Sequence, residues 1–364
     1  MFYSTNNPYV SLIEKSEEGL TITRNKVTMQ HIADTLNISK NSVSQALSGK
    51  GGVSGETREL IEETAFQMGY IYQQDRVNKM NNRTRCIGLI ASDYTFAQKN
   101  FFGEIYLEIE QEVSKKGMNL QIQSINQKMI DRLILPRFLE DQQMEGILVL
   151  SHLSTEYINL VIKTGIPTVL IDHHHPKIQA DCILTNNRFG AYDAVQHLID
   201  LGHRNIGFAG NIAYSPSYYE RLVGYMMALE AHHLELNPDF IIKDAKEEMD
   251  AVLYQLSQRK RQPTAWFCVN DALGFLFNSG LQQFGLKVPE DVSVCSFDNG
   301  QLSRMATPAT TSIEVNLKYY GIKAVEQLFW RIENRDLAFM EILLPTTLIQ
   351  RESTGGCNRV EQLV

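Results

Sequence analysis

The sequence predicts an α/β protein in which a three-helix helix-turn-helix domain precedes two doubly wound lobes built on parallel sheets. Apolar residues recur at helical spacing in three short segments between Val27 and Tyr70. From Cys86 onward, short apolar runs alternate with amphipathic segments, a pattern typical of parallel strands whose two faces are covered by helices. The roughly 265 residues in this part are too many for one comfortable core, which favours two lobes.

Each of the three helical segments has one apolar face. The apolar positions are Ile32, Ala33 and Leu36 in the first, Val43, Ala46 and Leu47 in the second, and Leu60, Ile61, Ala65 and Met68 in the third. Asn37 lies where the turn between the first two helices needs a positive φ, which Asn tolerates better than most residues. Ser39 is placed to cap the second helix through its hydroxyl. These features predict a compact helix-turn-helix.

The second helix, predicted near residues 40–47, has an outward face suited to DNA. That face consists of Lys40, Asn41, Ser42, Ser44, Gln45 and Ser48, with no acid among them. Between Arg24 and Lys50 there are four basic residues and one acid, Asp34, although the whole chain carries a net charge of −8. In helix-turn-helix proteins this helix enters the major groove, where Lys suits guanine and Asn or Gln suits adenine. The alternative is an ordinary solvated helix face.

The alternating part of the chain predicts nine strands and eight helices. The strands are expected at residues 86–91, 120–124, 146–150, 168–172, 182–184, 206–209, 265–269, 292–297 and 311–315, and the helices at 102–116, 128–140, 155–164, 188–201, 217–233, 247–258, 271–284 and 317–334. In open α/β sheets, ligands bind outside the carboxyl ends of the strands. That rule selects loop residues as candidates for a ligand site.

Acidic, amide, arginine and aromatic side chains follow the strands at these ends. The rule selects Asn100-Phe101-Phe102, Asp172-His173, Arg221, Asn270-Asp271 and Asp298-Asn299, and the residues we assign to the site are Phe101, Phe102, Asp172, Arg221, Asn270 and Asp298. Such a set suits a polyhydroxylated ligand, because the polar groups bind hydroxyls and the rings receive the apolar faces of a sugar. We expect the ligand to be a sugar or sugar derivative, with a nucleobase or other small metabolite as the alternative. Asn and Asp at strand ends also commonly cap the next helix, so each residue has a purely structural interpretation too.

Composition and motifs exclude several other classes of protein. The 43% hydrophobic and 21% charged content is typical of an ordinary globular protein, and no apolar run is long enough to span a membrane. The N-terminus lacks a basic start followed by an apolar stretch, so we expect no signal peptide and a cytoplasmic location. The five scattered cysteines and the adjacent His173–His175 have no metal-site spacing. No nucleophile elbow or phosphate loop is present, so we expect neither catalysis nor a cofactor.

The helix-turn-helix segment resembles the lactose-repressor (LacI/GalR) family of bacterial transcription regulators. The matching residues are Val27-Thr28, Ile32-Ala33, Ile38-Ser39, Ser42-Val43-Ser44, Leu47, Val53-Ser54, Thr57-Arg58 and Gly69-Tyr70. The chain departs from the family at His31, at Leu36-Asn37 and at Gln45, where the family favours Asp, Ala-Gly and Arg. The resemblance implies that Thr28, Ser39, Ser54 and Thr57 touch phosphates and that Lys40, Asn41 and Gln45 read bases. Ser42 and Ser48 complete the predicted DNA-binding set.

The resemblance extends to the second part of the chain. Arg221-Leu222-Val223-Gly224-Tyr225 is similar to the family segment R-x-x-G-[YF], whose Arg holds the effector, while Asn270-Asp271 and Ser296–Asn299 are similar to two further site segments. Leu201-Gly202-His203-Arg204 is similar to a turn that we interpret as structural. The family implies a periplasmic-binding-protein-like domain of two lobes, with the chain crossing between them near residues 187, 316 and 343. It also implies a ligand-responsive homodimeric regulator, with a repressor favoured.

These observations give a domain plan. We expect an N-terminal extension (1–26), the helix-turn-helix domain (27–72), a linker (73–85), the effector-binding and dimerisation domain (86–352) and a tail (353–364). Lobe 1 is expected to comprise residues 86–187 and 316–343, and lobe 2 residues 188–315 and 344–352. In the linker, Lys79 stands where the family has a leucine that wedges into the minor groove, and Met80 beside it is a substitute wedge. The alternative to a hinge helix is electrostatic binding of the DNA backbone by Arg76, Lys79, Arg83 and Arg85. The tail is too short for a heptad bundle, which favours a dimer.

Two functional classes therefore compete. The first is a ligand-responsive transcription regulator with double-stranded operator DNA and a small effector as its partners. The alternative is a cytoplasmic sugar-binding protein or enzyme without operator-specific DNA binding. Salt-dependent binding to promoter DNA discriminates between them.

Overall fold

The computed structural model describes residues 27–47, 52–68, 70, 85–97, 101–140, 143–150, 153–259 and 261–357. The chain divides into two compact units, residues 1–83 and residues 84–364. Serine 48 and nearly all of the predicted linker, including Lys79 and Met80, lie outside the described residues. Each unit is therefore described by itself.

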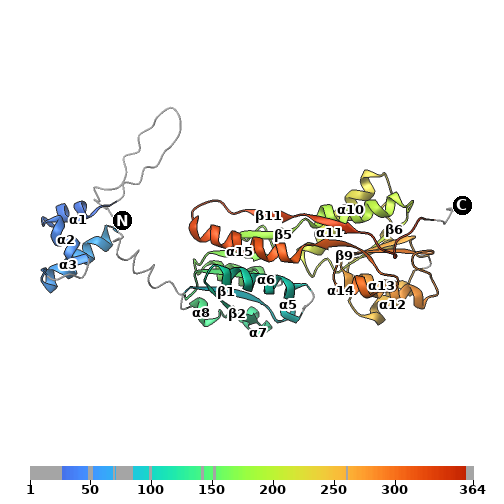
Figure 1. Ribbon diagram of the computed structural model, residues 1–364, viewed down its shortest axis with the longest axis horizontal. Coiled ribbons are helices and arrows are strands. Elements are labelled where there is room, and N and C mark those ends of the chain that lie inside the picture. The colour runs from blue at the N-terminus through green and yellow to red at the C-terminus, as the bar shows by residue number, and fades with distance from the viewer. Residues whose placement is uncertain are drawn as a thin grey trace, which may run out of the picture. The chain divides into compact units, whose positions relative to one another are not determined.

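The first unit contains the three predicted helices, α1 (Met29–Leu36), α2 (Lys40–Leu47) and α3 (Gly55–Gln67) (Figure 1). Its core consists of Ile32, Ala33, Val43, Ala46, Ile61 and Ala65. Asn37 ends α1 with a φ of 52°, which confirms the predicted left-handed turn. Leu60 was expected on the buried face but is 52% exposed. The reason is geometric: α3 buries positions 61 and 65, and Leu60 lies about 100° away around the helix.

The second unit consists of two lobes, each with its own six-stranded sheet (Figure 1). The sheet of lobe 1 has the strand order β11-β5-β4-β3-β1-β2, and all its pairs are parallel. Its strands are β1 (Cys86–Ser92), β2 (Asn119–Ile125), β3 (Gly146–Leu150), β4 (Thr168–Ile171), β5 (Asp181–Thr185) and β11 (Glu341–Leu344). Its helices are α5 (Asp93–Ala97), α6 (Phe102–Lys115), α7 (Gln127–Arg132), α8 (Arg137–Glu140), α9 (Thr155–Ile162) and α15 (Leu317–Glu333).

The lobe 1 sheet is buried on both faces because alternate residues of each strand point to opposite sides. Leu89 and Leu148 belong to the core that includes the apolar residues of α6 and α15. Their neighbours Ile90 and Val149 belong to a separate core with α8 and α9. This double coverage explains why the strands appear in the sequence as continuous apolar runs.

Lobe 2 repeats the arrangement with the strand order β12-β10-β9-β8-β6-β7. Its strands are β6 (Ile206–Ala209), β7 (Ile241–Ile242), β8 (Ala265–Cys268), β9 (Ser293–Asp298), β10 (Thr311–Val315) and β12 (Thr346–Ile349). Its helices are α10 (Asn187–Asp200), α11 (Pro216–Ala231), η1 (Pro238–Phe240), α12 (Met249–Ser257), α13 (Asp271–Gln283) and α14 (Gln301–Met305). Strand β12 pairs antiparallel with β10, so the sheet is not wholly parallel as predicted.

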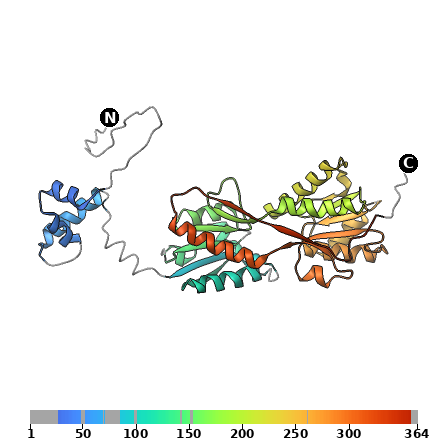
Figure 2. The same cartoon turned by 45° about the horizontal axis from the view of Figure 1, so that its top comes forward.

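The chain passes between the lobes three times. The passages lie at Asn186, between β5 and α10, at Asn316, between β10 and α15, and at Pro345, between β11 and β12. Figure 2 shows the last of these as a dark red segment running from one lobe into the other. The third passage lies two residues beyond the predicted position, because β11 continues to Leu344 in the lobe 1 sheet.

Several predicted boundaries need correction. The single helix expected at 128–140 is two helices, α7 and α8, because Leu133 adopts a left-handed φ of 53° and Pro136 follows. Strands β7, β11 and β12 were not predicted, since they are short edge strands and none is a continuous run of buried apolar residues. The tail expected to begin at 353 is integrated into lobe 2: Ser353 is fully buried and its Oγ accepts a hydrogen bond from the Thr311 amide at 2.8 Å.

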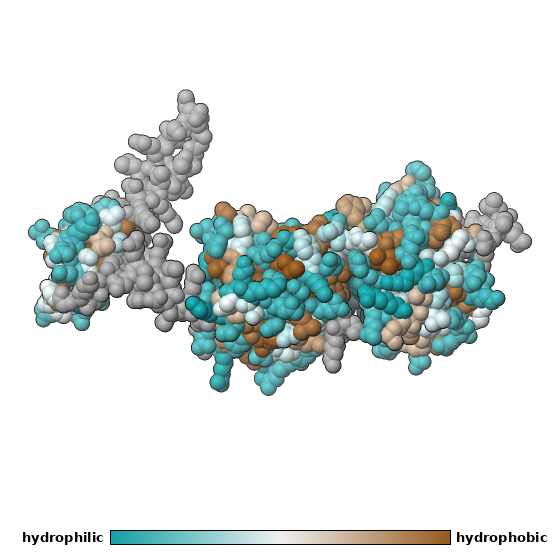
Figure 3. All heavy atoms as spheres, viewed as in Figure 1, coloured by the Kyte–Doolittle hydropathy of each residue, from teal (hydrophilic) through white to brown (hydrophobic). Residues whose placement is uncertain are grey.

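No helix among the described residues is long and apolar enough to cross a membrane. On the face shown in Figure 3, hydrophilic side chains dominate and apolar side chains are interspersed in small groups.

Candidate functional site

The predicted DNA-reading face lies on α2 of the first unit. Lys40 and Asn41 are exposed at the start of this helix, Ser42 beside them is half-buried, and Gln45 is half-buried about one turn further on. Neither the first nor the last turn of α2 contains an acid. The helix therefore presents donor groups near its N-terminus, where backbone amides and the helix dipole also favour an anionic partner.

The four residues expected at phosphates belong to the N-terminal caps of the three helices. Thr28 Oγ1 accepts from the His31 amide at 3.4 Å, and the Thr28 amide donates to His31 Nδ1 at 3.3 Å. Ser39 Oγ accepts from the Ser42 amide at 3.0 Å. His31, a departure from the family pattern, thus completes a reciprocal capping arrangement.

The third helix repeats this pattern, with Ser54 Oγ accepting from the Thr57 amide at 3.3 Å. Arg58 closes the other end of α2, since its Nη1 donates to the Ala46 carbonyl at 2.9 Å. A cationic group at a helix C-terminus satisfies free carbonyls and complements the dipole. The S-x-x-T-R segment therefore has a definite structural role within the helical unit.

A cavity of about 120 Å³ lies between the two lobes of the second unit. By the measure in which one water needs roughly 10–15 Å³, it has room for about ten water-sized groups, which suits a ligand the size of a monosaccharide. All six predicted ligand-site residues line it: Phe101, Phe102 and Asp172 from lobe 1, and Arg221, Asn270 and Asp298 from lobe 2. Segments separated by almost 200 residues of sequence thus meet at one place.

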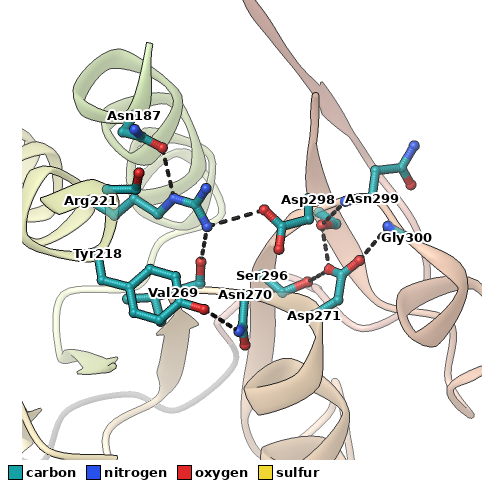
Figure 4. Close-up of polar contacts among 12 residues, drawn as sticks. Asn187, Tyr218, Arg221, Val269, Asn270, Asp271, Ser296, Asp298, Asn299 and Gly300 are labelled. Carbon is teal, nitrogen blue, oxygen red and sulfur yellow. Dashed lines mark hydrogen bonds and ion pairs between the residues drawn. The ribbon is translucent and has the colours of Figure 1, made fainter. Parts of the chain in front are cut away.

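Arg221 is the centre of the polar groups in the cavity (Figure 4). Its side chain is 3% exposed, and Nη1 lies 3.1 Å from Asp298 Oδ1. Nε donates to Asn187 Oδ1 at 2.9 Å, and Nη1 also donates to the Val269 carbonyl. The guanidinium stacks over the Phe297 ring, 3.7 Å from its centroid. These partners fix both the position and the plane of the cation before any ligand arrives.

The residues that follow Arg221 explain how α11 reaches this position. A Cβ on Gly224 would collide with the carbonyl oxygen of Arg188 on α10, so only glycine allows the two helices to approach this closely. Tyr225 is fully buried and its hydroxyl donates to the Ile206 carbonyl at 2.8 Å. The R-x-x-G-Y segment therefore combines a site cation, a close helix contact and an anchor to β6.

The backbone at the two site aspartates is unusual. Asp172 has a φ of 54°, Asp298 a φ of 103° and Asn299 a φ of 52°, values that non-glycine residues rarely adopt. Each of these residues directly follows or ends a strand, β4 or β9. Backbone strain of this kind persists where surrounding structure holds it and is common at ligand sites. Here it turns both carboxyl groups toward the cavity.

The carboxyl groups compete for one guanidinium. Burial raises the pKa of Asp298 to about 8, against the opposing influence of Arg221. Burial also raises the pKa of Asp172 to about 6, opposed by Arg221 and by the Ser217 hydroxyl, which donates to Oδ1 at 2.9 Å. One cation does not neutralise two buried carboxylates, so a proton shared within this group is favoured near neutral pH.

Asn270 both caps a helix and lines the cavity, the two roles that its position after a strand allowed. Its Oδ1 accepts from the Leu273 amide at 2.9 Å, which caps α13. Its Nδ2 donates to the Tyr218 hydroxyl at 2.7 Å and to Glu247 Oε1 at 2.6 Å, and all three side chains line the cavity.

Sequence reasoning missed several residues that line the cavity, and also Asn187, which contacts Arg221. Tyr218 and Ser217 precede Arg221 on α11 by one turn, so helical spacing was a usable signal for both. Asn187 immediately follows a lobe passage and Glu247 lies in a loop, and neither has a local pattern that marks it. Tertiary packing alone brings these two to the site.

His203, in the turn interpreted as structural, is buried among strands of lobe 2. Its Nδ1 lies 3.0 Å from Thr264 Oγ1, and its Nε2 lies 3.0 Å from Ser293 Oγ. The Gly355 carbonyl is also within hydrogen-bond distance of Nε2. The turn thus joins the end of α10 to two strands and to the C-terminal segment, away from the cavity.

Comparison with known proteins places these features in a family context. Residues 195–354 match the model of a periplasmic binding protein-like domain. The chain is 30% identical over 331 residues to the ribose operon repressor of Haemophilus influenzae, covering 90% of this chain and 98% of that relative. It is 29% identical over 316 residues to the HTH-type transcriptional repressor PurR of Vibrio campbellii, covering 85% and 93%. The solved complex of the transcriptional regulator CelR with cellobiose matches with a TM-score of 0.67 and 25% identity, over 90% of this chain and 100% of that one.

Proposed function

Because the chain belongs to the LacI/GalR family of transcription regulators, we propose that it is an operator-binding repressor controlled by a small effector in the inter-lobe cavity. The observation that carries this proposal is the convergence of Arg221, Asp298, Asp172 and aromatic side chains from both lobes on one cavity. A ligand held by both lobes binds one lobe arrangement better than another and so shifts the population of arrangements. Coupling of this kind is typically about 1–3 kcal/mol, a 5- to 150-fold change in DNA affinity.

The DNA-binding part of the proposal rests on α2. We assign base contacts to Lys40, Asn41 and Gln45, further contacts to Ser42 and Ser48, and phosphate contacts to the capping residues Thr28, Ser39, Ser54 and Thr57. A homodimer would place two such helices on half-sites of an approximate palindrome. In this proposal the protein works in the cytoplasm and catalyses no reaction.

The charges in the cavity favour an uncharged effector. The lining contains four carboxyl groups (Asp172, Glu247, Asp271 and Asp298) and one guanidinium, that of Arg221. A phosphorylated or carboxylated sugar would meet this excess of acid, whereas sugar hydroxyls can donate to carboxylates and accept from the guanidinium. The four lining rings, Phe101, Phe102, Tyr214 and Tyr218, offer faces for the apolar side of a sugar ring. A neutral sugar therefore fits best, and the solved complex of the regulator CelR contains such a sugar, cellobiose.

The test combines DNA and ligand in one assay. Binding of the full chain to DNA from upstream of its own coding region is followed by fluorescence anisotropy, with D-ribose, D-ribose 5-phosphate, cellobiose and adenine as probes. We expect salt-sensitive specific binding that a neutral sugar alters and the phosphorylated sugar does not. Ligand binding without specific DNA binding would favour the sugar-binding alternative. A response to the phosphorylated sugar alone would refute the charge argument.

A further inference from the structure

The loop after β4 contacts α11 at two successive positions, and only one of them lies in the cavity. Asp172 and His174 belong to lobe 1, whereas Ser217 and Glu220 lie in the first two turns of α11 in lobe 2. Ser217 Oγ donates to Asp172 Oδ1 at 2.9 Å within the cavity lining. His174 Nε2 lies 3.3 Å from Glu220 Oε1, and neither of these two residues lines the cavity.

The second contact continues through side chains to the site cation. Asn187 Nδ2 donates to Glu220 Oε2 at 3.0 Å, and Arg221 Nε donates to Asn187 Oδ1 at 2.9 Å. Asn187 is 1% exposed and Arg221 3%, so these links are shielded from water and have little freedom to rearrange. An unbroken series of polar contacts therefore runs from His174 in lobe 1 to the guanidinium that faces the ligand space.

We propose that His174 is a positioning residue, an inference that rests on the proposed function. Its contact with Glu220 holds the lobes in the arrangement that brings Asp172 and Arg221 to one cavity, and protonation of its ring sets the strength of that contact. His174 acts from outside the ligand site, through lobe closure and through the orientation of Arg221. Effector affinity is then linked to the protonation of a group that the effector does not touch.

The surroundings of the ring favour its charged form. Its charged and titratable neighbours are Glu220 on α11, Glu341 on β11, Asp172, His173 and His175 of its own loop, and Arg188 of α10 beside Glu220. Nδ1 lies 3.4 Å from Glu341 Oε1, so both ring nitrogens face carboxylates. Only the imidazolium can donate from both nitrogens at once.

The direction of the pH dependence follows from these contacts. The hydrogen bond to Glu220 is the largest influence that raises the pKa of His174 above its ordinary value. For Glu220, burial raises the pKa, but the hydrogen bonds from His174 and Asn187 outweigh it and lower the pKa overall. The contact is therefore fully present below the ordinary pKa of histidine and weakens as pH rises through the raised pKa.

Hydrogen–deuterium exchange of the full chain without ligand tests the proposal directly. Wild type, H174Q and the control H175Q are compared at about pH 6 and about pH 8, each against wild type at the same pH. His175 is the matched control because it is in the same loop and its Nδ1 accepts from the Lys177 amide, two residues away in that loop. The readout is the peptide spanning residues 214–224, which contains the start of α11.

We expect H174Q to exchange about two- to fivefold faster than wild type at about pH 6, with a smaller difference at about pH 8. H175Q should match wild type, and E220Q should reproduce H174Q. E341Q should have a smaller effect, since Glu341 is 60% exposed. Exchange of H174Q equal to wild type at both pH values, or a difference of the same size at both, would overturn the proposal.

A ligand arm separates this proposal from the proposed function. The same exchange experiment is repeated with saturating D-ribose and with cellobiose. If neither sugar protects residues 214–224 of wild type while the H174Q difference persists, the effector assignment fails and the positioning role stands. If a sugar binds wild type and H174Q with equal affinity at both pH values, the positioning role fails and the proposed function stands.

Discussion

In the helical unit, polar side chains have partners close by in the sequence, whereas in the inter-lobe cavity they have partners far away. Thr28, Ser39 and Ser54 each cap a helix through a residue three positions later. Arg221 instead contacts Asn187 and Asp298, 34 and 77 residues away. The first arrangement leaves Lys40 and Asn41 exposed at the start of α2. The second encloses charged groups in a cavity of about 120 Å³.

The helical unit and the inter-lobe cavity are therefore expected to respond differently to substitution. Under the proposed function, a change on the exposed face of α2 removes a contact with DNA and leaves the fold intact. A change at Arg221 or its neighbours leaves buried groups without partners, so it affects ligand binding and stability together.

The largest effect is expected from Arg221→Ala. Loss of the guanidinium leaves Asp298 and Asp172 without their shared cation and removes the ligand's main donor. We expect effector affinity to fall by at least about 100-fold, equivalent to about 3 kcal/mol, while operator affinity stays within a few fold. Isothermal titration with the effector and anisotropy with DNA measure the two quantities.

The control is Arg335→Ala, which removes an exposed arginine far along the chain from α11. It should change neither quantity. An effector response of normal size in Arg221→Ala would show that the cavity is not the effector site.

A smaller effect, on stability alone, is expected from glycine substitutions in the two units. Gly224→Ala places a Cβ against the Arg188 carbonyl and should lower the free energy of unfolding by about 1–3 kcal/mol. Gly55→Ala, at the start of α3, meets nothing within 4 Å and should be neutral or slightly stabilising. Thermal denaturation followed by circular dichroism distinguishes them, and equal destabilisation by both would contradict the close-approach argument.

Gln45→Ala is expected to cause a loss of free energy of similar size, but only in the discrimination between DNA sequences. If Gln45 reads a base, its removal should cost about 1–3 kcal/mol of discrimination between the operator and single-base variants. Effector binding should not change. Competition binding with a set of operator variants measures the loss, and an unchanged preference would reject the assignment of Gln45 to the reading face.

The last expected effect is a change in the pH dependence of stability, measured as a slope and not as a loss at one pH. The pKa of Asp298 in the folded chain is about 8, above the ordinary value, so its contribution to stability is present at low pH and is lost as pH rises toward 8. Asp298→Asn does not titrate. We expect the free energy of unfolding of wild type to fall relative to this variant between about pH 4 and about pH 8.

The matched control for the pH experiment is Asp250→Asn, on the exposed surface of α12. Urea denaturation at a series of pH values gives the slopes. Parallel curves for wild type and Asp298→Asn would indicate that burial does not hold a proton on this carboxyl group.

The sequence alone determined the parts of this protein that depend on local patterns. Helical periodicity located α1, α2 and α3, and the need for a positive φ located Asn37. Continuous apolar runs located the inner strands, because those strands are buried on both faces. The rule that ligands bind at the carboxyl ends of strands, together with the family resemblance, selected six residues that all line one cavity. These inferences need only local sequence patterns, a general rule and the family resemblance.

Only the tertiary structure decided features that depend on distant segments. The short edge strands β11 and β12 and the burial of Ser353 follow from pairing with strands far away in the sequence. The links from His174 through Glu220 and Asn187 to Arg221 join two lobes and have no local signature. The physical reason is that periodicity records which face of an element is buried, but it does not record which other element covers that face.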